Sequence, residues 1–259
     1  MLKSRYFMKI NWNIFQEKRC LYCLQPFTPT SKPTLLENHI HQFLCPTCAA
    51  YLVQRKTGYC KTCGQLLNDP EYIYQECGVC RNTNILWDSF LFYGKYDSLL
   101  RELIRKAKFH NNRAITKFLG ELLALLFYEK YHIDFSEFYS LDIVPMPLHK
   151  KRLRERGYNQ CLELAKFFTT KLQALAPQIN LNLHYHYLQK SRHTIPQSSL
   201  DKKERLTNTK NSFQTNNENL EKILLIDDIA TTNSTLKEVC KTLKKSNVKS
   251  IDVLVIAKA

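Results

Sequence analysis

The sequence predicts an α/β domain built on a mostly parallel sheet flanked by helices, preceded by a small cysteine-rich module. Eight of the ten cysteines lie early in the chain, between Cys20 and Cys80. From about Trp87 onward, short apolar segments alternate with longer segments whose apolar residues recur at helical spacing. Because strands that alternate with helices indicate a parallel sheet covered on both faces, we expect a cysteine module over residues 1–86 and an α/β domain over residues 87–259.

The cysteines of the first module form four Cys-x-x-Cys pairs, a spacing that supplies two thiolate ligands from one tight turn. Four pairs predict two structural zinc sites of zinc-ribbon type, because four protein thiolates leave no position for water. Sequential pairing would give the first two pairs to one ion, whereas an interleaved arrangement would exchange partners. His39 and His41 are alternative ligands, although we expect them in solvent-facing loops. The expected ligands are Cys20, Cys23, Cys45, Cys48, Cys60, Cys63, Cys77 and Cys80.

The second domain alternates regularly between the two kinds of element. Apolar runs of strand length occupy residues 89–94, 141–145, 222–227 and 250–257, and an alternating run occupies residues 184–188. Helical periodicity covers residues 97–109, 114–131, 158–175 and 234–246. Parallel sheets bind ligands at the carboxyl ends of their strands. The segments that follow residues 144 and 228 are therefore the expected binding loops.

The most informative segment runs from a buried strand, residues 223–226, through two acids to a hydroxyl-rich loop that opens a helix. Such a loop presents backbone N–H groups and the positive end of the helix dipole to an anion. The acids suit the hydroxyl groups of a sugar beside that anion. The segment thus indicates a ribose 5-phosphate site, and the alternative is an ordinary helix N-cap. Its candidate residues are Asp227, Asp228, Ala230, Thr231, Thr232, Asn233, Ser234 and Thr235.

This segment resembles the signature of the phosphoribosyltransferases. The resemblance implies that the acids bind the ribose hydroxyls of phosphoribosyl pyrophosphate and that the loop binds its 5′-phosphate. Asn233 departs from the signature, which has glycine there, and asparagine is the next most tolerant residue for a positive φ. In related transferases the loop after the Val-Pro strand binds pyrophosphate, which here implies Pro145, Met146 and Pro147. Magnesium would accompany the ligand, held mainly by the ligand's own oxygens.

Three further blocks, over residues 92–109, 145–160 and 191–213, resemble the ComF competence family, whose members carry a cysteine-rich N-terminus before this domain. The resemblance covers nearly the whole chain beyond Cys20. It implies a factor that handles incoming single-stranded DNA in natural transformation, alongside other DNA-uptake proteins. The last block contains residues expected to cover the site or to cap the sheet: Arg192, His193, Gln197 and Arg205.

A basic run follows the predicted strand over residues 141–145. Its cations are expected to bind pyrophosphate or the backbone of a single nucleic-acid strand, with Tyr158, Tyr185 and Tyr187 available to stack on bases. The alternative is a solvated helix face. The net charge of +15 fits an anionic partner, or a generally basic proteome. The cations are Lys150, Lys151, Arg152, Arg154 and Arg156.

Functions of different classes stay open at this point. One is a non-enzymatic DNA-handling factor with a site for phosphoribosyl pyrophosphate or a nucleotide. Another is an active phosphoribosyltransferase with an unknown acceptor, and a third is a nucleotide-sensing regulator. No secretory signal or membrane span is evident, which predicts a cytoplasmic protein. The amphipathic N-terminus, with Ile10, Trp12, Ile14 and Phe15, is compatible with peripheral contact at the inner face of the membrane.

Overall fold

The computed structural model describes residues 17–69, 71–131, 140–191 and 212–259. The chain divides into two compact units, Met1–Tyr51 and Leu52–Ala259. The predicted domain boundary at residues 86 and 87 stays a prediction, while compactness assigns residues 52–86 to the larger unit. Several residues singled out above lie outside the described residues: Ile10, Trp12, Ile14, Phe15, Arg192, His193, Gln197 and Arg205.

The smaller unit contains an antiparallel ribbon of β1 (Lys18–Arg19) and β2 (Pro26–Phe27), followed by α1 (Leu35–Phe43) and α2 (Pro46–Ala50). α1 begins after Thr34, whose side chain accepts a hydrogen bond from the N–H of Glu37. Its apolar stripe is buried and forms a small core. His39 lies on this helix and is buried against the ring of Phe43, so the expectation of a solvent-facing loop position was wrong for it.

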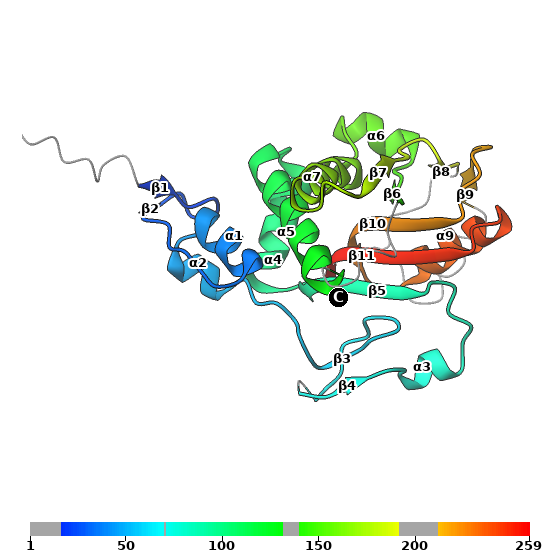
Figure 1. Cartoon of the computed structure of the whole chain (residues 1–259), viewed down its shortest axis with the longest axis horizontal. Helices are drawn as coiled ribbons and strands as arrows, with labels where there is room; N and C mark the ends of the chain where they lie inside the picture. Colours follow the sequence, from blue (N-terminus) through cyan, green and yellow to red (C-terminus); the bar gives the residue numbers. More distant parts are fainter. Residues whose placement is uncertain (1–16, 70, 132–139, 192–211) are drawn as a thin grey trace, which may run out of the picture. The chain divides into compact units, whose positions relative to one another are not determined.

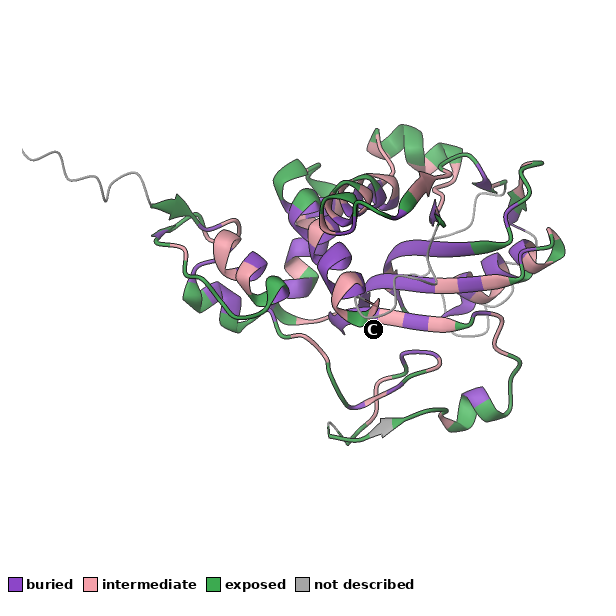
Figure 2. Cartoon of the chain, in the orientation of Figure 1, coloured by how far each residue is buried: buried purple, intermediate pink, exposed green. Residues whose placement is uncertain are grey.

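A five-stranded sheet forms the centre of the larger unit, in the order β5-β11-β10-β6-β7 (Figure 1). All neighbouring strands pair in parallel. Figure 2 shows the middle strands buried along most of their length, as the nearly continuous apolar sequence of β10 and β11 predicts. The strands are β5 (Ser89–Lys95), β6 (Ser140–Pro145), β7 (Asn180–Leu183), β10 (Lys222–Ala230) and β11 (Ser250–Lys258).

The helices of this unit follow the strands in the chain, which confirms the predicted α/β class. Side chains of α9 pack in one core with Ile223 and Leu225 from one face of β10. α5 and α7 approach closely at Gly120, where an added Cβ would lie 2.7 Å from the carbonyl oxygen of Leu164. The helices are α4 (Ser98–Phe109), α5 (Arg113–Tyr131), α6 (Lys150–Arg156), α7 (Gln160–Leu175) and α9 (Ser234–Lys245).

The predicted strand over residues 184–188 was wrong. β7 ends at Leu183, a turn follows, and β8 (Leu188–Lys190) then pairs antiparallel with β9 (Phe213–Thr215). The turn is held by His184, whose ring nitrogens lie 3.0 Å from Asp142 Oδ1 and 2.6 Å from Glu218 Oε2. The alternating sequence of this segment therefore forms a turn in which Tyr185 and His186 are exposed and Tyr187 is buried.

Candidate functional site

A cavity of about 460 Å³ opens beside the carboxyl ends of β6 and β10, where parallel sheets bind ligands. The N–H of Met146 donates to the carbonyl oxygen of Ile226 at 2.8 Å, so the two expected binding loops lie side by side. The cavity is lined by these sequence-predicted residues: Met146, Pro147, Arg152, Arg156, Asp227, Asp228, Ala230, Thr231, Asn233 and Thr235. The other predicted residues lie outside its lining: Pro145, Lys150, Lys151, Arg154, Thr232 and Ser234.

Asp228 is the buried anion of the cavity. Lys108, near the end of α4, has its Nζ 2.9 Å from Asp228 Oδ2, and the side-chain amide of Gln160 donates to the same oxygen. The guanidinium of Arg156 donates in turn to Gln160 Oε1. Burial alone would raise the pKa of Asp228, but Lys108 and Gln160 outweigh burial and hold the pKa below its ordinary value. Asp228 is therefore ionised at neutral pH and has a lysine as its countercharge.

Asp227 has a different environment from its neighbour. Its Oδ1 accepts a hydrogen bond from the N–H of Asp228 at 2.9 Å, and the thiol of Cys161 lies 3.3 Å from the same oxygen. Burial, together with the charge of Asp228, raises the pKa of Asp227 to about 7. Burial and the two acids also raise the pKa of Cys161, which stays a neutral thiol. The acid pair thus carries between one and two negative charges at neutral pH.

The loop over residues 230–235, called the hydroxyl loop below, leads from β10 into α9. Asn233 is the N-cap of α9 and has a φ of 59°, the left-handed conformation that favours glycine or asparagine. The hydroxyl oxygens of Thr232 and Ser234 lie 3.0 Å apart. The first amides of a helix lack partners within the helix, so this loop combines N–H and O–H donors at the positive end of α9, which suits an anion.

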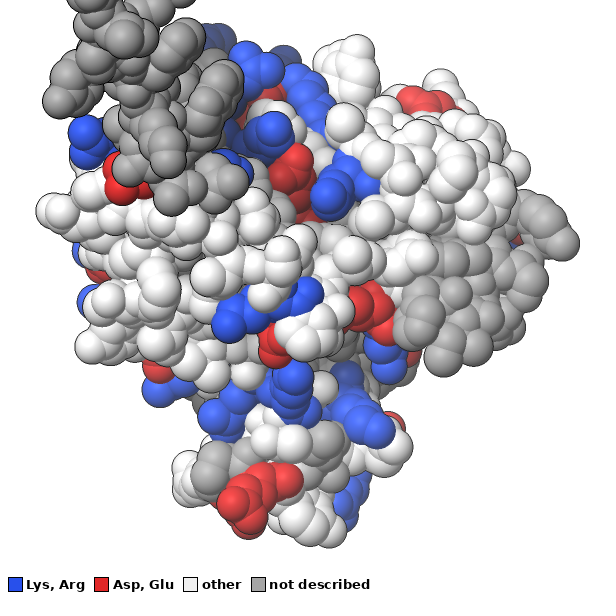
Figure 3. Space-filling model, turned by 60° about the vertical axis from the view of Figure 1, so that its left-hand side comes forward, with Lys and Arg blue, Asp and Glu red and all other residues white. Residues whose placement is uncertain are grey.

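The basic run forms α6 and divides into two sets. Arg152 and Arg156 lie one helical turn apart and line the cavity. Lys150, Lys151 and Arg154 are exposed. Figure 3 shows a face on which Lys and Arg side chains gather, with a few acidic side chains between them. The arginines that line the cavity and the exposed cations of α6 can therefore bind different anions.

Of the tyrosines expected to stack on bases, only Tyr185 is freely exposed. The residue is 54% exposed, and the centre of its ring lies 4.0 Å from that of the His186 ring. Tyr187 is fully buried, which excludes it from base stacking. The hydroxyl of Tyr158 donates to the carbonyl oxygen of Ala107, so this ring holds α4 and the start of α7 together.

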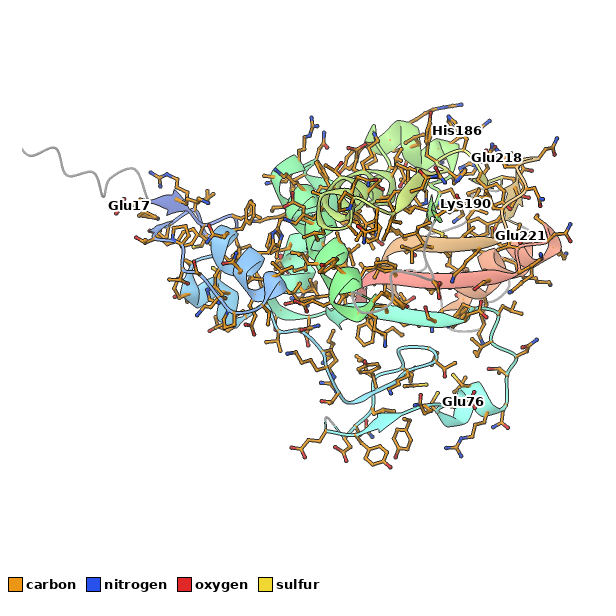
Figure 4. All side chains as sticks on the ribbon, viewed as in Figure 1. Glu17, Glu76, His186, Lys190, Glu218 and Glu221 are labelled. Carbon is orange, nitrogen blue, oxygen red and sulfur yellow. The ribbon has the colours of Figure 1, made fainter. Side chains whose placement is uncertain are left out.

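Several residues of the cavity had no assigned role in the sequence-based prediction, among them three polar ones: Lys108, Gln160 and Lys190. Lys108 lies in the last turn of α4, where a basic residue is common because of the helix dipole, so only its place in the block over residues 92–109 pointed to it. Gln160 is the last residue of the block over residues 145–160, so the resemblance of that block could have identified it as a site residue. Lys190, labelled in Figure 4, lies on β8 with its Nζ 5.4 Å from the centre of the Phe213 ring.

The eight cysteines of the N-terminal region form two groups of four. The first cysteine cluster is Cys20, Cys23, Cys45 and Cys48, and the second is Cys60, Cys63, Cys77 and Cys80. In each cluster the four sulfur atoms lie within 4.8 Å of one another. Measured pairs are separated by 3.6 to 3.9 Å, and tetrahedral zinc with bonds of about 2.3 Å would place its sulfurs about 3.8 Å apart. The residues therefore fit zinc, with sequential pairing and, among the described residues, no histidine in either cluster.

The second cysteine cluster belongs to the larger unit and packs on its sheet. Its turns include β3 (Tyr59–Cys60), β4 (Ile73–Tyr74) and α3 (Gly78–Arg81). The indole of Trp87 donates to the carbonyl oxygen of Thr62 at 2.6 Å, and Phe90 of β5 packs against Gly64. The side-chain amide of Asn233 donates to the carbonyl oxygen of Cys63 at 2.8 Å. This cluster therefore lies directly behind the hydroxyl loop.

The parallel sheet flanked by helices gives the larger unit the α/β fold that the phosphoribosyltransferase-like resemblance predicted, here combined with two cysteine clusters. No family model matches the chain. Competence protein F of Haemophilus influenzae is 32% identical over 223 residues, which cover 83% of this chain and 90% of that protein. The chain therefore belongs to the competence protein F family, as the sequence motifs predicted.

Two further relatives and one solved structure are similar to this chain. DNA utilization protein YhgH of Escherichia coli is 26% identical and covers 82% of this chain and 89% of its own length. Competence protein ComFC of Bacillus subtilis is 28% identical and covers 74% of each chain. A hypoxanthine phosphoribosyltransferase from Staphylococcus aureus has a TM-score of 0.34 and 11% identity, covering 55% of this chain and 64% of that chain. Within the described residues, no helix has both the length and the apolar character needed to cross a membrane.

Proposed function

We propose that this chain is a factor that handles incoming single-stranded DNA in natural transformation, and that its cavity binds phosphoribosyl pyrophosphate or a nucleotide with the same ribose 5-phosphate. The observation that carries the proposal is the acid pair and the hydroxyl loop lining one cavity. Similarity to proteins named for competence and DNA utilization supports the DNA role. The protein would work in the cytoplasm beside other DNA-uptake proteins, in part at the inner face of the membrane, with structural zinc in both clusters.

The ribose 5-phosphate would lie across the end of β10. Thr231 and Thr235 line the cavity, and their hydroxyls, together with the first amides of α9, would donate to the 5′-phosphate. The ribose hydroxyls would donate to Asp227 and Asp228, which directly precede the loop. This order of groups along the chain matches the order of groups along the ligand.

Two full carboxylates beside a phosphorylated sugar would repel it, and two features reduce that repulsion. Lys108 neutralises Asp228 at a distance of 2.9 Å. Asp227, whose pKa is raised to about 7 by burial and by Asp228, is partly protonated at neutral pH. The carboxylate oxygens also fit magnesium, which prefers oxygen ligands and would take most of them from the ligand and water.

Pyrophosphate recognition would fall mainly to side chains. In the segment over residues 145–147, the two prolines have no N–H, and the N–H of Met146 already donates to Ile226. Arg152, Arg156 and Lys190 line the same cavity and would supply the charge. The exposed set of α6 would instead contact the phosphates of single-stranded DNA.

The ligand half of the proposal is tested by calorimetry of the full chain with phosphoribosyl pyrophosphate and magnesium. We expect saturable binding, and we expect Asp227→Asn/Asp228→Asn to weaken it by roughly 1–3 kcal/mol for each lost interaction. Asp97→Asn, at an exposed helix start and not itself part of the cavity lining, is the control. Absence of binding by the wild type, or equal binding by a folded double variant, would overturn the assignment.

The DNA half is tested by fluorescence anisotropy with a labelled oligonucleotide across a salt series. For a single strand, log affinity should fall against log salt with a slope of about −0.7 per neutralised phosphate. Lys150→Ala/Lys151→Ala/Arg154→Ala should flatten the slope by about two units if all three side chains contact phosphates. Arg152→Ala/Arg156→Ala should weaken pyrophosphate binding and leave most of the slope. An unchanged slope in the triple variant would remove α6 from the DNA surface.

An active phosphoribosyltransferase is the second candidate, favoured by the carboxyl of Asp227. A pKa raised to about 7 by burial and by the neighbouring acid lets this group exchange a proton at neutral pH. Release of pyrophosphate on addition of a nucleobase or amine would support transfer. Binding of phosphoribosyl pyrophosphate without such release, across a panel of acceptors, would favour the binding role.

A further inference from the structure

The hydroxyl loop is fastened to the second cysteine cluster by a buried side chain. Asn233 Nδ2 donates to the carbonyl oxygen of Cys63 at 2.8 Å, and the two residues are 170 positions apart in the sequence. The Asn233 residue is 8% exposed. Among the described residues, its Oδ1 has no hydrogen-bond partner. The bond to Cys63 is therefore the polar contact that fixes the orientation of this side chain.

A second buried side chain holds the hydroxyl loop, from the end of β11. Lys258 is 1% exposed, and its Nζ donates to the carbonyl oxygen of Thr231 in the hydroxyl loop. The carbonyl of Thr231 is thus held by a buried lysine at the end of β11, in addition to the bond between Asn233 and Cys63.

Packing connects the hydroxyl loop and the second cysteine cluster as well. Cys60, Cys63 and Cys80 share one core with Ala230 of the loop and Leu236 of α9. The turn that carries Cys63 is closed by two backbone hydrogen bonds, from Cys60 N to Gln65 O at 2.9 Å and from Gly64 N to Cys60 O at 2.8 Å. Four ligands on one ion would hold this turn rigid, and metal loss would free it. The carbonyl oxygen that Asn233 needs is therefore placed by the cluster.

We propose that Asn233 is a positioning residue through which the metal-loaded second cysteine cluster holds the hydroxyl loop in its anion-binding shape. Glycine at this position would permit the positive φ but could not reach Cys63. Asparagine permits the same φ and adds the bond. Loss of metal from the second cluster then loosens the loop, whereas loss from the first cluster does not. The consequence for ligand affinity rests on the proposed function, and the consequence for loop order does not.

The test is hydrogen–deuterium exchange of the full chain without ligand, followed through peptides that cover residues 229–236. Asn233→Asp keeps the shape and tolerates the positive φ but as a carboxylate, at pH 8, cannot donate to a carbonyl, and Asn233→Gly removes the side chain. Both should exchange roughly fivefold faster in the loop, as expected for one lost hydrogen bond. Cys77→Ser/Cys80→Ser should do the same. Cys20→Ser/Cys23→Ser, which disrupts the first cluster, should leave loop exchange unchanged.

Combining the variants tests whether the second cysteine cluster acts on the hydroxyl loop through Asn233. Combining Asn233→Gly with Cys77→Ser/Cys80→Ser should add little further exchange in the loop, because the link is already broken. Wild-type exchange in both Asn233 variants would overturn the proposal, as would an equal effect from the first-cluster variant. The Asn233 variants leave every cysteine in place, so they test whether the bond to Cys63 orders the loop even if the second-cluster variant unfolds. Calorimetry with phosphoribosyl pyrophosphate is run in parallel, so failure of the wild type to bind counts against the proposed function alone.

Discussion

Lys108 offers a sharp test of how the acid pair is held. Its Nζ lies 2.9 Å from Asp228 Oδ2, and the side chain of Asp228 is only 8% exposed. Replacing Lys108 with methionine keeps the aliphatic stem and removes the charge. Removing one partner of a buried ion pair costs about 3–5 kcal/mol when the other partner stays charged. Gln160 still donates to Asp228, so we expect a loss of about 2–4 kcal/mol in the free energy of unfolding at pH 8.

The pH dependence gives the sign of the effect. In the wild type, Lys108 and Gln160 outweigh burial and hold the pKa of Asp228 below its ordinary value. Asp228 then contributes stability that is present above the unfolded-state pKa and is lost as the pH falls through the folded-state pKa. In Lys108→Met, burial raises the pKa of Asp228 instead, so the folded protein binds a proton more tightly than the unfolded chain. The variant's deficit should therefore be largest at pH 8 and shrink toward pH 5.

Urea denaturation at both pH values measures this deficit. Lys108→Met/Asp228→Asn is the matched control, because it removes the second charge together with the first. It should be more stable than Lys108→Met at pH 8, which a double-mutant cycle would report as a coupling energy. A deficit below about 1 kcal/mol, or one that does not change with pH, would show that this ion pair behaves as a surface pair, and the reasoning on the acid pair would fail.

Three further predictions follow from other parts of the structure. Metal analysis of protein purified without added zinc should give about two zinc ions per chain, and a value near zero with all thiols reactive would contradict the metal assignment. Gly120→Ala should lower the free energy of unfolding by about 1–3 kcal/mol, since its Cβ would meet the carbonyl oxygen of Leu164 at 2.7 Å; an unchanged urea midpoint would show that α5 and α7 yield freely. Asp227, whose folded-state pKa is raised to about 7 from 3.8 by burial and by Asp228, should make stability fall as the pH rises from about 4 to 7, and Asp227→Asn should flatten that component of the profile.

The spacing of apolar residues was sufficient to predict the strands and helices that form the core of the larger unit. β10 and β11 are apolar on both faces, and α4 and α9 have one apolar stripe each, so their local sequence agrees with their burial. The same reasoning failed over residues 184–188. There Tyr187 is buried in a core shared with Phe213 and Leu220, which come later in the chain, and local alternation does not reveal such packing.

The candidate site was predictable where its residues are consecutive in the chain. Asp227, Asp228 and the hydroxyl loop form one segment, and the topology of a parallel sheet brings Met146 and Pro147 beside them. Lys108 was not predictable as a partner of the acids, because it comes from a helix that precedes the acids by 120 positions. The raised pKa of Asp227 depends on burial and on the charge of Asp228, so it too requires the structure.

The second cysteine cluster is where sequence organisation and spatial organisation differ most. Its four cysteines continue the spacing of the first cluster, which favours one N-terminal module with a boundary near residue 86. Compactness instead groups it with the sheet, because Trp87 and Phe90 pack against its turns and Asn233 bonds to Cys63. These contacts attach the second cysteine cluster to the sheet and the hydroxyl loop. Placed behind the hydroxyl loop, it is part of the site's supporting structure, and the departure from glycine at position 233 then has a physical reason: the asparagine side chain bonds the loop to the cluster.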